Sequence, residues 1–248
     1  MKKVLLLVVL LFGFFTQAQI VNIPDANLKA VLLQSADYIH YAYSGGQMVA
    51  IDQNSNGEIE MSEASVIDSL YVLSNNVASL DGLEAFTSLK ALSFPFNDVS
   101  EIELTSFPGL LKLECFGNPI SNLNLSATPN LRNLAVDECP LTQLDLSFVP
   151  LLHTLSIGNP ELSVLDLSGC PDLRTLGVNL PFFSSQHLAQ VPNLQLLNCH
   201  NSAELDLSLV PNLKWLGLLN YHFDSIALES LVNLIRFNCI DSDVITLD

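Results

Sequence analysis

One short acidic segment, DQNSNGEIEMSE at residues 52–63, has the residue types and spacing to hold a metal ion. Oxygen-bearing side chains recur at alternate positions, Gly57 allows a sharp turn, and the twelfth position is a glutamate at the expected start of a helix. A hard cation such as Ca²⁺ is held by carboxylate, amide and carbonyl oxygens arranged in this way. The candidate ligands are the side chains of Asp52, Asn54 and Asn56, the backbone carbonyl of Glu58, and the side chains of Glu60 and Glu63.

The spacing of these residues, D-x-N-x-N-G-x₅-E, resembles the calcium loop of EF-hand and dockerin-like modules. The resemblance implies one calcium ion bound weakly, with a dissociation constant of about 10⁻⁴–10⁻³ M, because the loop is solitary. A plain turn at Asn56-Gly57 is the alternative, since the helix expected from Pro24 does not run into the loop and Gly45-Gly46 lies between them. The sequence leaves both interpretations open.

The sequence holds no arrangement of side chains that is typical of an active site. None of the five histidines belongs to an H-E-x-x-H pair, and the G-x-S-x-G, G-x-G-x-x-G and phosphate-loop patterns do not occur. His153 shares its place before a predicted strand with Lys90 and Arg132, which indicates a solvated polar row. We therefore expect a protein that is not an enzyme.

Most of the chain repeats a leucine-rich pattern, L-x-x-L-x-L, with a weaker first copy from Ile67. A three-residue strand cannot bury its apolar face alone, so successive copies must lie side by side as a parallel sheet over one continuous core. The later copies, mostly 21 residues apart, begin at Leu89, Leu110, Leu131, Leu152, Leu173, Leu194, Leu213 and Leu234.

These copies follow L-x-x-L-x-L-x-x-N/C-x-L, and residues 67–248 thereby resemble the leucine-rich repeat family, in particular internalin-like bacterial surface proteins. The resemblance implies an α/β-type repeat solenoid dominated by β-structure, a horseshoe with its parallel β-sheet on the concave face. A second L-x-L in each repeat, as in LDLSFVP, is expected to form a short strand or a 3₁₀ turn on the convex side. We expect about nine repeats, the last of them uncapped.

Two segments precede the repeats. Residues 1–19 combine Lys2 and Lys3, an apolar run and a small residue at Ala18, which is typical of a secretory signal peptide. Residues 20–66 contain a helix from Pro24 and the acidic loop, and are expected to form an N-terminal helical cap over the first repeat. We therefore expect a secreted, extracellular or cell-surface protein without membrane insertion after signal cleavage.

The charge of the chain limits its partners. The formal net charge is −17, with 26 acidic residues against nine Lys and Arg. A chain this acidic repels phosphate backbones and anionic membrane surfaces. Nucleic acid and acidic lipid are therefore not expected as partners.

Interior positions of the repeats also hold asparagine and cysteine. Asn97 and Asn118 fill the position where an asparagine satisfies backbone groups of the turn, whereas Cys139 and Pro160 stand there in the next two repeats, so those turns need other partners. Cysteines in interior columns are predicted to be buried thiols rather than disulfides, because sulfurs several strand spacings apart cannot bond. The cysteines are Cys115, Cys139, Cys170, Cys199 and Cys239.

The outward positions of the strands provide a candidate binding surface on the concave face. Trp215, the only tryptophan, stands two residues before Gly217, and a tryptophan next to a depression is a typical interface anchor. The alternative is that Trp215 is covered by the chain itself. The predicted ligand-binding residues are Asn198, His200, Trp215, Arg236, Phe116 and Asn179.

These observations favour a non-enzymatic protein that binds a protein partner through its concave face, in adhesion or recognition. A protein partner is preferred because the surface mixes apolar and neutral polar groups. A carbohydrate, stacked on Trp215, is the second choice. The competing functional class is a carbohydrate-binding or structural module of the cell envelope.

Overall fold

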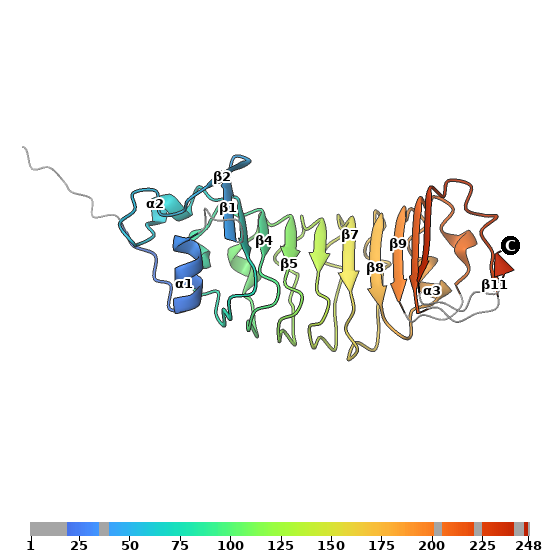
Figure 1. Cartoon of the computed structure of the whole chain (residues 1–248). Coiled ribbons are helices and arrows are strands. Elements are labelled where there is room, and N and C mark those ends of the chain that lie inside the picture. The colour runs from blue at the N-terminus through green and yellow to red at the C-terminus, as the bar shows by residue number, and fades with distance from the viewer. Residues whose placement is uncertain (1–18, 35–39, 201–204, 221–224, 241–245, 248) are drawn as a thin grey trace, which may run out of the picture.

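The computed structural model describes residues 19–34, 40–200, 205–220, 225–240 and 246–247. They form an elongated ribbon in which one strand follows the next along a single axis (Figure 1). The main sheet has eleven strands in the order β12-β10-β9-β8-β7-β6-β5-β4-β3-β1-β2. The predicted signal peptide, apart from its last residue, lies outside the described residues. In the part of the chain described, no helix is long and apolar enough to cross a membrane.

Each repeat contributes one parallel strand, and equivalent leucines lie side by side. Leu134 is paired in register with Leu155, and Leu155 with Leu176, and all three are at most 1% exposed. The predicted stack of inward leucines over one core is therefore confirmed. The strands are β3 (Ser69–Val72), β4 (Ala91–Ser93), β5 (Lys112–Glu114), β6 (Asn133–Ala135), β7 (Thr154–Ile157), β8 (Thr175–Asn179), β9 (Leu196–His200), β10 (Trp215–Leu219) and β12 (Arg236–Ile240).

The convex side of the repeats, where the chain returns from one strand to the next, is called the return side below. It consists of turns and very short helices, as the 21-residue period predicted. Within the described ranges, the 3₁₀ helices are η1 (Leu83–Ala85), η2 (Leu104–Ser106) and η3 (Leu207–Leu209). A four-residue helix, α3 (Ser185–Leu188), takes this place in another repeat. The fold is thus a β-dominated solenoid.

Acidic side chains begin several of these turns. Asp145 accepts hydrogen bonds from the backbone N–H of Ser147 at 2.9 Å and from its hydroxyl at 2.6 Å. These bonds hold the pKa of Asp145 below its ordinary value. The same contact with a backbone N–H two residues later is made by Glu103, Asp166 and Asp206. The acidic row on the return side is therefore explained by turn formation, because each carboxylate satisfies an otherwise unpaired N–H.

The N-terminal segment covers the first repeat with a helix, α1 (Ala26–Leu33), as predicted. One oxygen of the Asp25 carboxylate accepts a hydrogen bond from the backbone N–H of Leu28 at 2.9 Å and caps the helix. The other accepts from the N–H groups of Ala78 and Ser79, at 2.8 and 3.1 Å. Asp25 thus joins the start of α1 to the backbone of the first repeat.

Two further strands in this segment were not expected from the sequence. β1 (His40–Ser44) pairs antiparallel with β3 on one side and with β2 (Gln47–Val49) on the other. The stretch YIHYAYSGGQMV, which suggests only a break after the helix, therefore extends the sheet beyond the repeats. A short helix, α2 (Met61–Ala64), follows the acidic loop.

Buried asparagines satisfy the backbone where the strands end. The Asn97 side-chain oxygen accepts hydrogen bonds from the N–H groups of Asn75 and Val77, and its nitrogen donates to the carbonyls of Val72 and Phe94. Asn118 makes the equivalent contacts one repeat later: its oxygen accepts from a backbone N–H at 3.1 Å, and its nitrogen donates to two carbonyls at 2.9 Å. These side chains form a continuous ladder between neighbouring repeats.

The ladder continues with a cysteine at the next predicted position and, one repeat later, with a residue beside the predicted position. The Cys139 thiol donates to the Cys115 carbonyl at 3.4 Å, a carbonyl that also accepts from Asn118. In the following repeat the ladder residue is Asn159, one position before Pro160, and its oxygen accepts from the Cys139 N–H at 3.1 Å. Asn159 is fully buried, and its side-chain nitrogen has no hydrogen-bond partner among the described residues.

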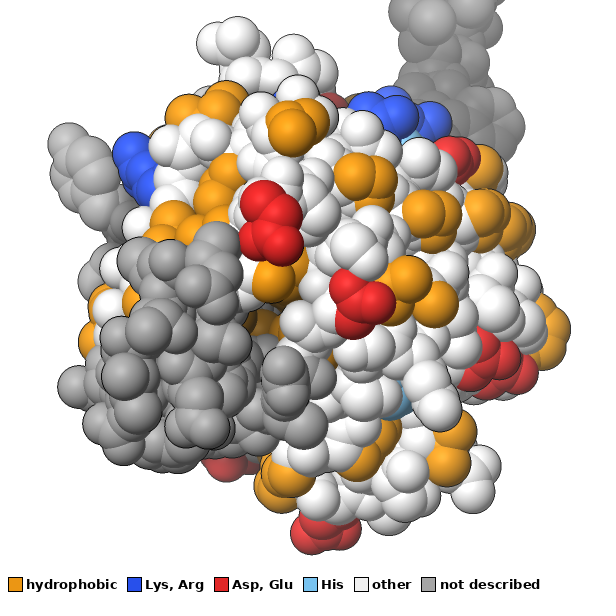
Figure 2. Space-filling view, turned by 90° about the vertical axis from the view of Figure 1, so that its right-hand side faces the viewer, with side chains coloured by type: hydrophobic (Ala, Val, Ile, Leu, Met, Phe, Trp, Pro, Cys, Tyr) orange, Lys and Arg blue, Asp and Glu red, His pale blue; other side chains and the backbone are white. Residues whose placement is uncertain are grey.

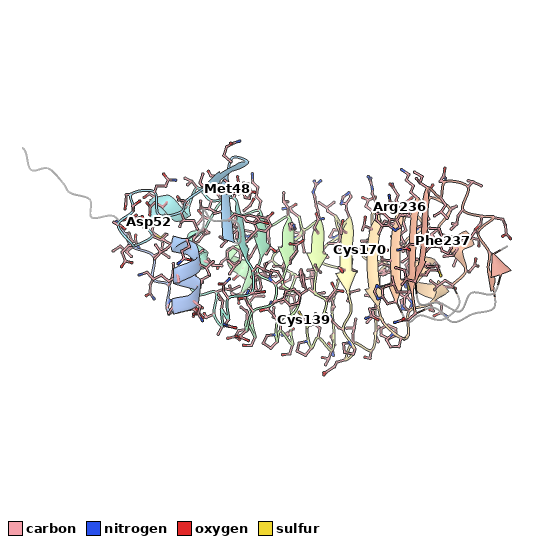
Figure 3. All side chains as sticks on the ribbon, viewed as in Figure 1. Met48, Asp52, Cys139, Cys170, Arg236 and Phe237 are labelled. Carbon is pink, nitrogen blue, oxygen red and sulfur yellow. The ribbon has the colours of Figure 1, made fainter. Side chains whose placement is uncertain are left out.

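All five cysteines lie within the described residues, and no disulfide joins any of them. Cys115, Cys139, Cys170 and Cys199 are buried, which confirms their predicted interior placement, whereas Cys239 is partly exposed. Cys139 and Cys170 lie inside the ribbon (Figure 3). Burial raises the pKa of the Cys170 thiol to about 11, so the neutral thiol is the stable form there.

At the C-terminal end, β12 is the last strand of the main sheet. Its interior side chains, Phe237 and Cys239, are only partly buried, and Val232 and Ile235 are 85% and 82% exposed. Hydrophobic groups are visible among polar ones on this end of the molecule (Figure 2). A small parallel pair, β11 (Ser225–Ile226) with β13 (Thr246–Leu247), continues the return side.

Replacing Asn118 by alanine should lower the free energy of unfolding by about 1–3 kcal/mol, because one buried N–H loses its partner and two carbonyls each lose one of their donors. Urea denaturation of the purified chain measures the change. The control is Asn124→Ala, which removes an exposed turn contact to Ser126 and should cost much less. Equal losses in the two variants would contradict the structural role of the ladder.

Candidate functional site

The concave face is formed by side chains that alternate with the buried leucines. The strand register aligns them in rows that run across the sheet. The middle row consists of Tyr41, Tyr71, Ser93, Glu114, Ala135, Ser156, Gly177, Asn198, Gly217 and Asn238.

A depression of about 480 Å³ lies in the centre of this face. Two glycines of its lining leave room for side chains of the adjacent repeats: a Cβ at Gly158 would stand 3.1 Å from Asp137 Oδ1 and 3.2 Å from Asn179 Cβ, and one at Gly177 would stand 3.2 Å from Ser156 Oγ. Four of the six predicted ligand-binding residues, Phe116, Asn179, Asn198 and His200, line this depression. The structure therefore brings them together in one place.

An aromatic pair forms one wall of the depression. The Phe96 and Phe116 rings are edge-to-face, with centroids 5.1 Å apart. Phe96 is 50% exposed and has φ 54°, and its ring lies against Gly117, where an added Cβ would stand 2.5 Å from a ring carbon. Sequence reasoning missed Phe96 because the strand pattern assigns Pro95 to the outward position. Only the left-handed backbone turns the next side chain toward this face.

Asp137 is the second residue of this site that sequence reasoning did not select. Burial raises the pKa of its carboxyl group, and a hydrogen bond with the Ser156 side chain partly offsets that effect. Glu138 and His200 are the other titratable groups that line the depression, and no Lys or Arg is among its described lining residues. The depression therefore has an acidic character beside its aromatic wall.

Trp215 and Arg236 form a separate pair at the other ends of the strands. They are register partners in β10 and β12, and the Arg236 guanidinium carbon lies 4.8 Å from the centroid of the Trp215 ring, a cation–π arrangement. Trp215 is half-buried and Arg236 is exposed. His200 aligns with Leu219, four residues along the strand from Trp215, or roughly 13 Å. The six predicted residues thus occupy two places, not one.

The space beside Trp215 that the sequence suggested is already occupied. A Cβ at Gly217 would stand 2.2 Å from Asn198 Oδ1, so the Asn198 side chain lies over this glycine. Gly217 is accordingly buried. The glycine that seemed to provide a depression instead receives the side chain of the neighbouring strand.

A tyrosine cluster occupies the N-terminal part of the concave face. The Tyr41 ring lies 4.5 Å from that of Tyr71 and 5.6 Å from that of Tyr43, measured between centroids. Lys112 lies 5.4 Å above the Tyr71 ring and forms an ion pair with Glu114 at 2.9 Å. Sequence reasoning missed this cluster because β1, which presents two of the tyrosines, was not expected to be a strand.

The acidic loop, residues 52–63, lies in the cap, far from the C-terminal strands (Figure 3). The Asp52 carboxylate accepts from the backbone N–H groups of Asn56 and Gly57, at 3.2 and 2.9 Å, and Gly57 has φ 82°. The Glu63 carboxylate reaches back to accept from the N–H of Gln53 at 2.9 Å. The first and last predicted ligands therefore belong to one closed turn.

Two of the remaining predicted ligands, Asn54 and Asn56, contact a third, Glu60. Its carboxylate accepts hydrogen bonds from the side-chain nitrogens of Asn54 and Asn56, at 3.1 and 2.7 Å. Glu60 is 4% exposed, whereas the Glu58 side chain turns away to pair with Lys29 at 2.6 Å. This leaves the backbone carbonyl as the only candidate donor from Glu58. The donor set is entirely oxygen and fits a hard cation.

Carboxylates alone do not make a metal site in this loop. Across the described residues, no group of three or more His, Cys, Asp or Glu side chains is arranged to hold a metal ion. A cation here would depend on amide and backbone oxygens as well. Such a mixed donor set is typical of weak calcium sites.

Solved structures with a similar fold include bacterial leucine-rich repeat proteins. An internalin C2 from Listeria monocytogenes has a TM-score of 0.67 and 18% identity over 90% of this chain and 98% of that chain. A second internalin of that species has a TM-score of 0.59 and 20% identity over 93% and 80%. A leucine-rich repeat protein from Leptospira interrogans has a TM-score of 0.61 and 19% identity over 74% and 51%.

No protein-family model and no curated protein matches the sequence. At these identities the structural likenesses concern the fold. This chain has the fold of a leucine-rich repeat solenoid.

Proposed function

We propose that this protein is a secreted or cell-surface recognition module that binds a protein partner on its concave face, without catalysis. The supporting observation is the distribution of half-exposed aromatic side chains around the central depression. Tyr71 lies on one side, Phe116 in its wall and Trp215 beyond it. Tyrosine, tryptophan, phenylalanine and arginine are the residues enriched in the energetic centres of protein interfaces.

The two aromatic groups at the ends of this face already pack against other side chains of the protein. Tyr71 packs between Tyr41 and Lys112, and Trp215 packs against Arg236. Side chains that are already ordered lose less entropy on binding. An extended partner that contacts both ends would also cover the central depression.

A carbohydrate partner, with the protein acting as a module of the cell envelope, is the second candidate. The depression combines a phenylalanine wall with the carboxyl group of Asp137 and the polar side chains of Asn179 and His200. Such a mixture of an apolar ring and hydrogen-bonding groups also suits a sugar. We place it second because the aromatic groups extend well beyond the depression.

We also propose that the loop at residues 52–63 binds one calcium ion and thereby stabilises the cap. Asp52, Asn54, Asn56, Glu60 and Glu63 would supply side-chain oxygens, and Glu58 its backbone carbonyl. The side chains of Asn54 and Asn56 both contact the Glu60 carboxylate, and this gathering of oxygen-bearing side chains supports the proposal. The ion would have a structural role.

Alanine substitutions on the concave face test the principal proposal. A panel of purified extracellular protein domains and glycans is screened by surface plasmon resonance against the wild-type chain. Phe116→Ala and Trp215→Ala should each weaken a genuine ligand by about 30-fold, the effect of losing an interface hot spot. The control is Phe148→Ala, an exposed phenylalanine of the return side, which should leave binding unchanged.

Protein ligands that respond in this way support the first candidate, and glycans alone would support the second. Binding that is insensitive to both concave-face substitutions would overturn the proposed site.

Calcium binding is tested by thermal unfolding with and without 10 mM Ca²⁺. Because a ligand of the folded state stabilises by mass action, a site with a dissociation constant of about 1 mM would add about 1.4 kcal/mol. Glu63→Gln should abolish the increase. Glu58→Gln, which makes the same change of charge but keeps the backbone carbonyl, should preserve it. Melting curves that coincide with and without calcium would leave the loop as a plain turn.

A further inference from the structure

The titratable side chains that line the central depression limit which chemical groups of a partner could bind there. Its titratable lining residues are Asp137, Glu138 and His200. Asp137 is half-buried, Glu138 is exposed, and the chain as a whole has a net charge of −17. The depression is therefore a place where a positive group of a partner would be attracted.

The geometry places the carboxylate beside the aromatic wall. Phe116 and Asp137 occupy equivalent positions in neighbouring repeats, and the Gly117 N–H donates to the Asp137 carbonyl at 2.9 Å. Their side chains therefore start about one strand spacing apart, roughly 4.8 Å. Asp137 Oδ1 lies 3.1 Å from the point where a Cβ at Gly158 would stand, so the carboxylate packs close to this glycine. Asp137 lines the same depression as Phe96 and Phe116.

Three basic groups of the chain are paired at other places. On the concave face, Lys112 is paired with Glu114, and Arg236 lies over Trp215. In the cap, Lys29 is paired with Glu58. The carboxyl group of Asp137 forms a hydrogen bond with the Ser156 side chain, and His200 is the one basic side chain among the described lining residues.

We propose that the depression receives a lysine or arginine side chain of the protein partner, with its charged group at Asp137 and its apolar stem along Phe96 and Phe116. A carboxylate next to an aromatic ring suits both parts of such a side chain, because the ring attracts the cation through its quadrupole and packs against the methylene groups. This inference rests on the proposed protein-binding function and identifies the residue type that the partner contributes.

A random peptide library displayed on phage tests this inference with a defined probe. Peptides selected on the wild-type chain should be enriched in Lys or Arg at one position. Replacement of that residue by norleucine in a synthetic peptide should weaken binding by about tenfold, as measured by calorimetry. Asp137→Asn should weaken the original peptide by a similar factor and should not further weaken the norleucine peptide.

The acidic chain attracts basic peptides non-specifically, and Asp145→Asn controls for this effect. That variant makes the same change of charge on the return side and should retain the full affinity of the selected peptide. Equal losses in the two variants would assign the effect to overall charge and overturn the proposed contact.

Two further outcomes separate this inference from the function on which it rests. Peptides that are lost with Phe116→Ala but show no preference for Lys or Arg would overturn the cation contact and leave the concave binding face intact. Peptides that bind equally well to wild type, Phe116→Ala, Trp215→Ala and Asp137→Asn would overturn both.

Discussion

The structure depends on one constraint: a strand of three to five residues buries its leucine only when an equivalent strand lies on either side. Leu134, Leu155 and Leu176 satisfy this condition through direct register pairing and almost complete burial. Because each repeat is stabilised by its neighbours, the interior positions have little chemical freedom. Even the polar groups inside, such as Asn97 and Asn118, serve the connection between one repeat and the next.

The outward side chains of the strands do not have to fill the core. A binding site can therefore arise at these outward positions. Gly158 and Gly177 lie between buried neighbours in the chain, and on the concave face they receive side chains of the adjacent repeats. Asp137 lies outward between the buried Val136 and Cys139. Residues that contribute little to the stack therefore form the concave face, where the proposed partner would bind.

The repeat period predicted the sheet, the inward leucines and the buried cysteines, because these features follow from local spacing alone. It predicted the rows of the concave face for the same reason, including Phe116, Asn179, Asn198 and His200. It did not predict the left-handed backbone of Phe96 or the use of Asn159 instead of Pro160, since both depend on local turn geometry. The period did not predict that Trp215 lies apart from the depression, because the alignment of rows does not give the distance between two positions along a strand.

Asp25 links the local unfolding of the cap to that of the first repeat. Its two carboxylate oxygens serve different structures, one the first turn of α1 and the other the backbone of Ala78 and Ser79. Fraying of the helix start would therefore also deprive the adjacent layer of its hydrogen bonds. Amide protons on both sides of this carboxylate should become accessible to solvent together, so the cap and the first layer behave as one cooperative unit in local unfolding.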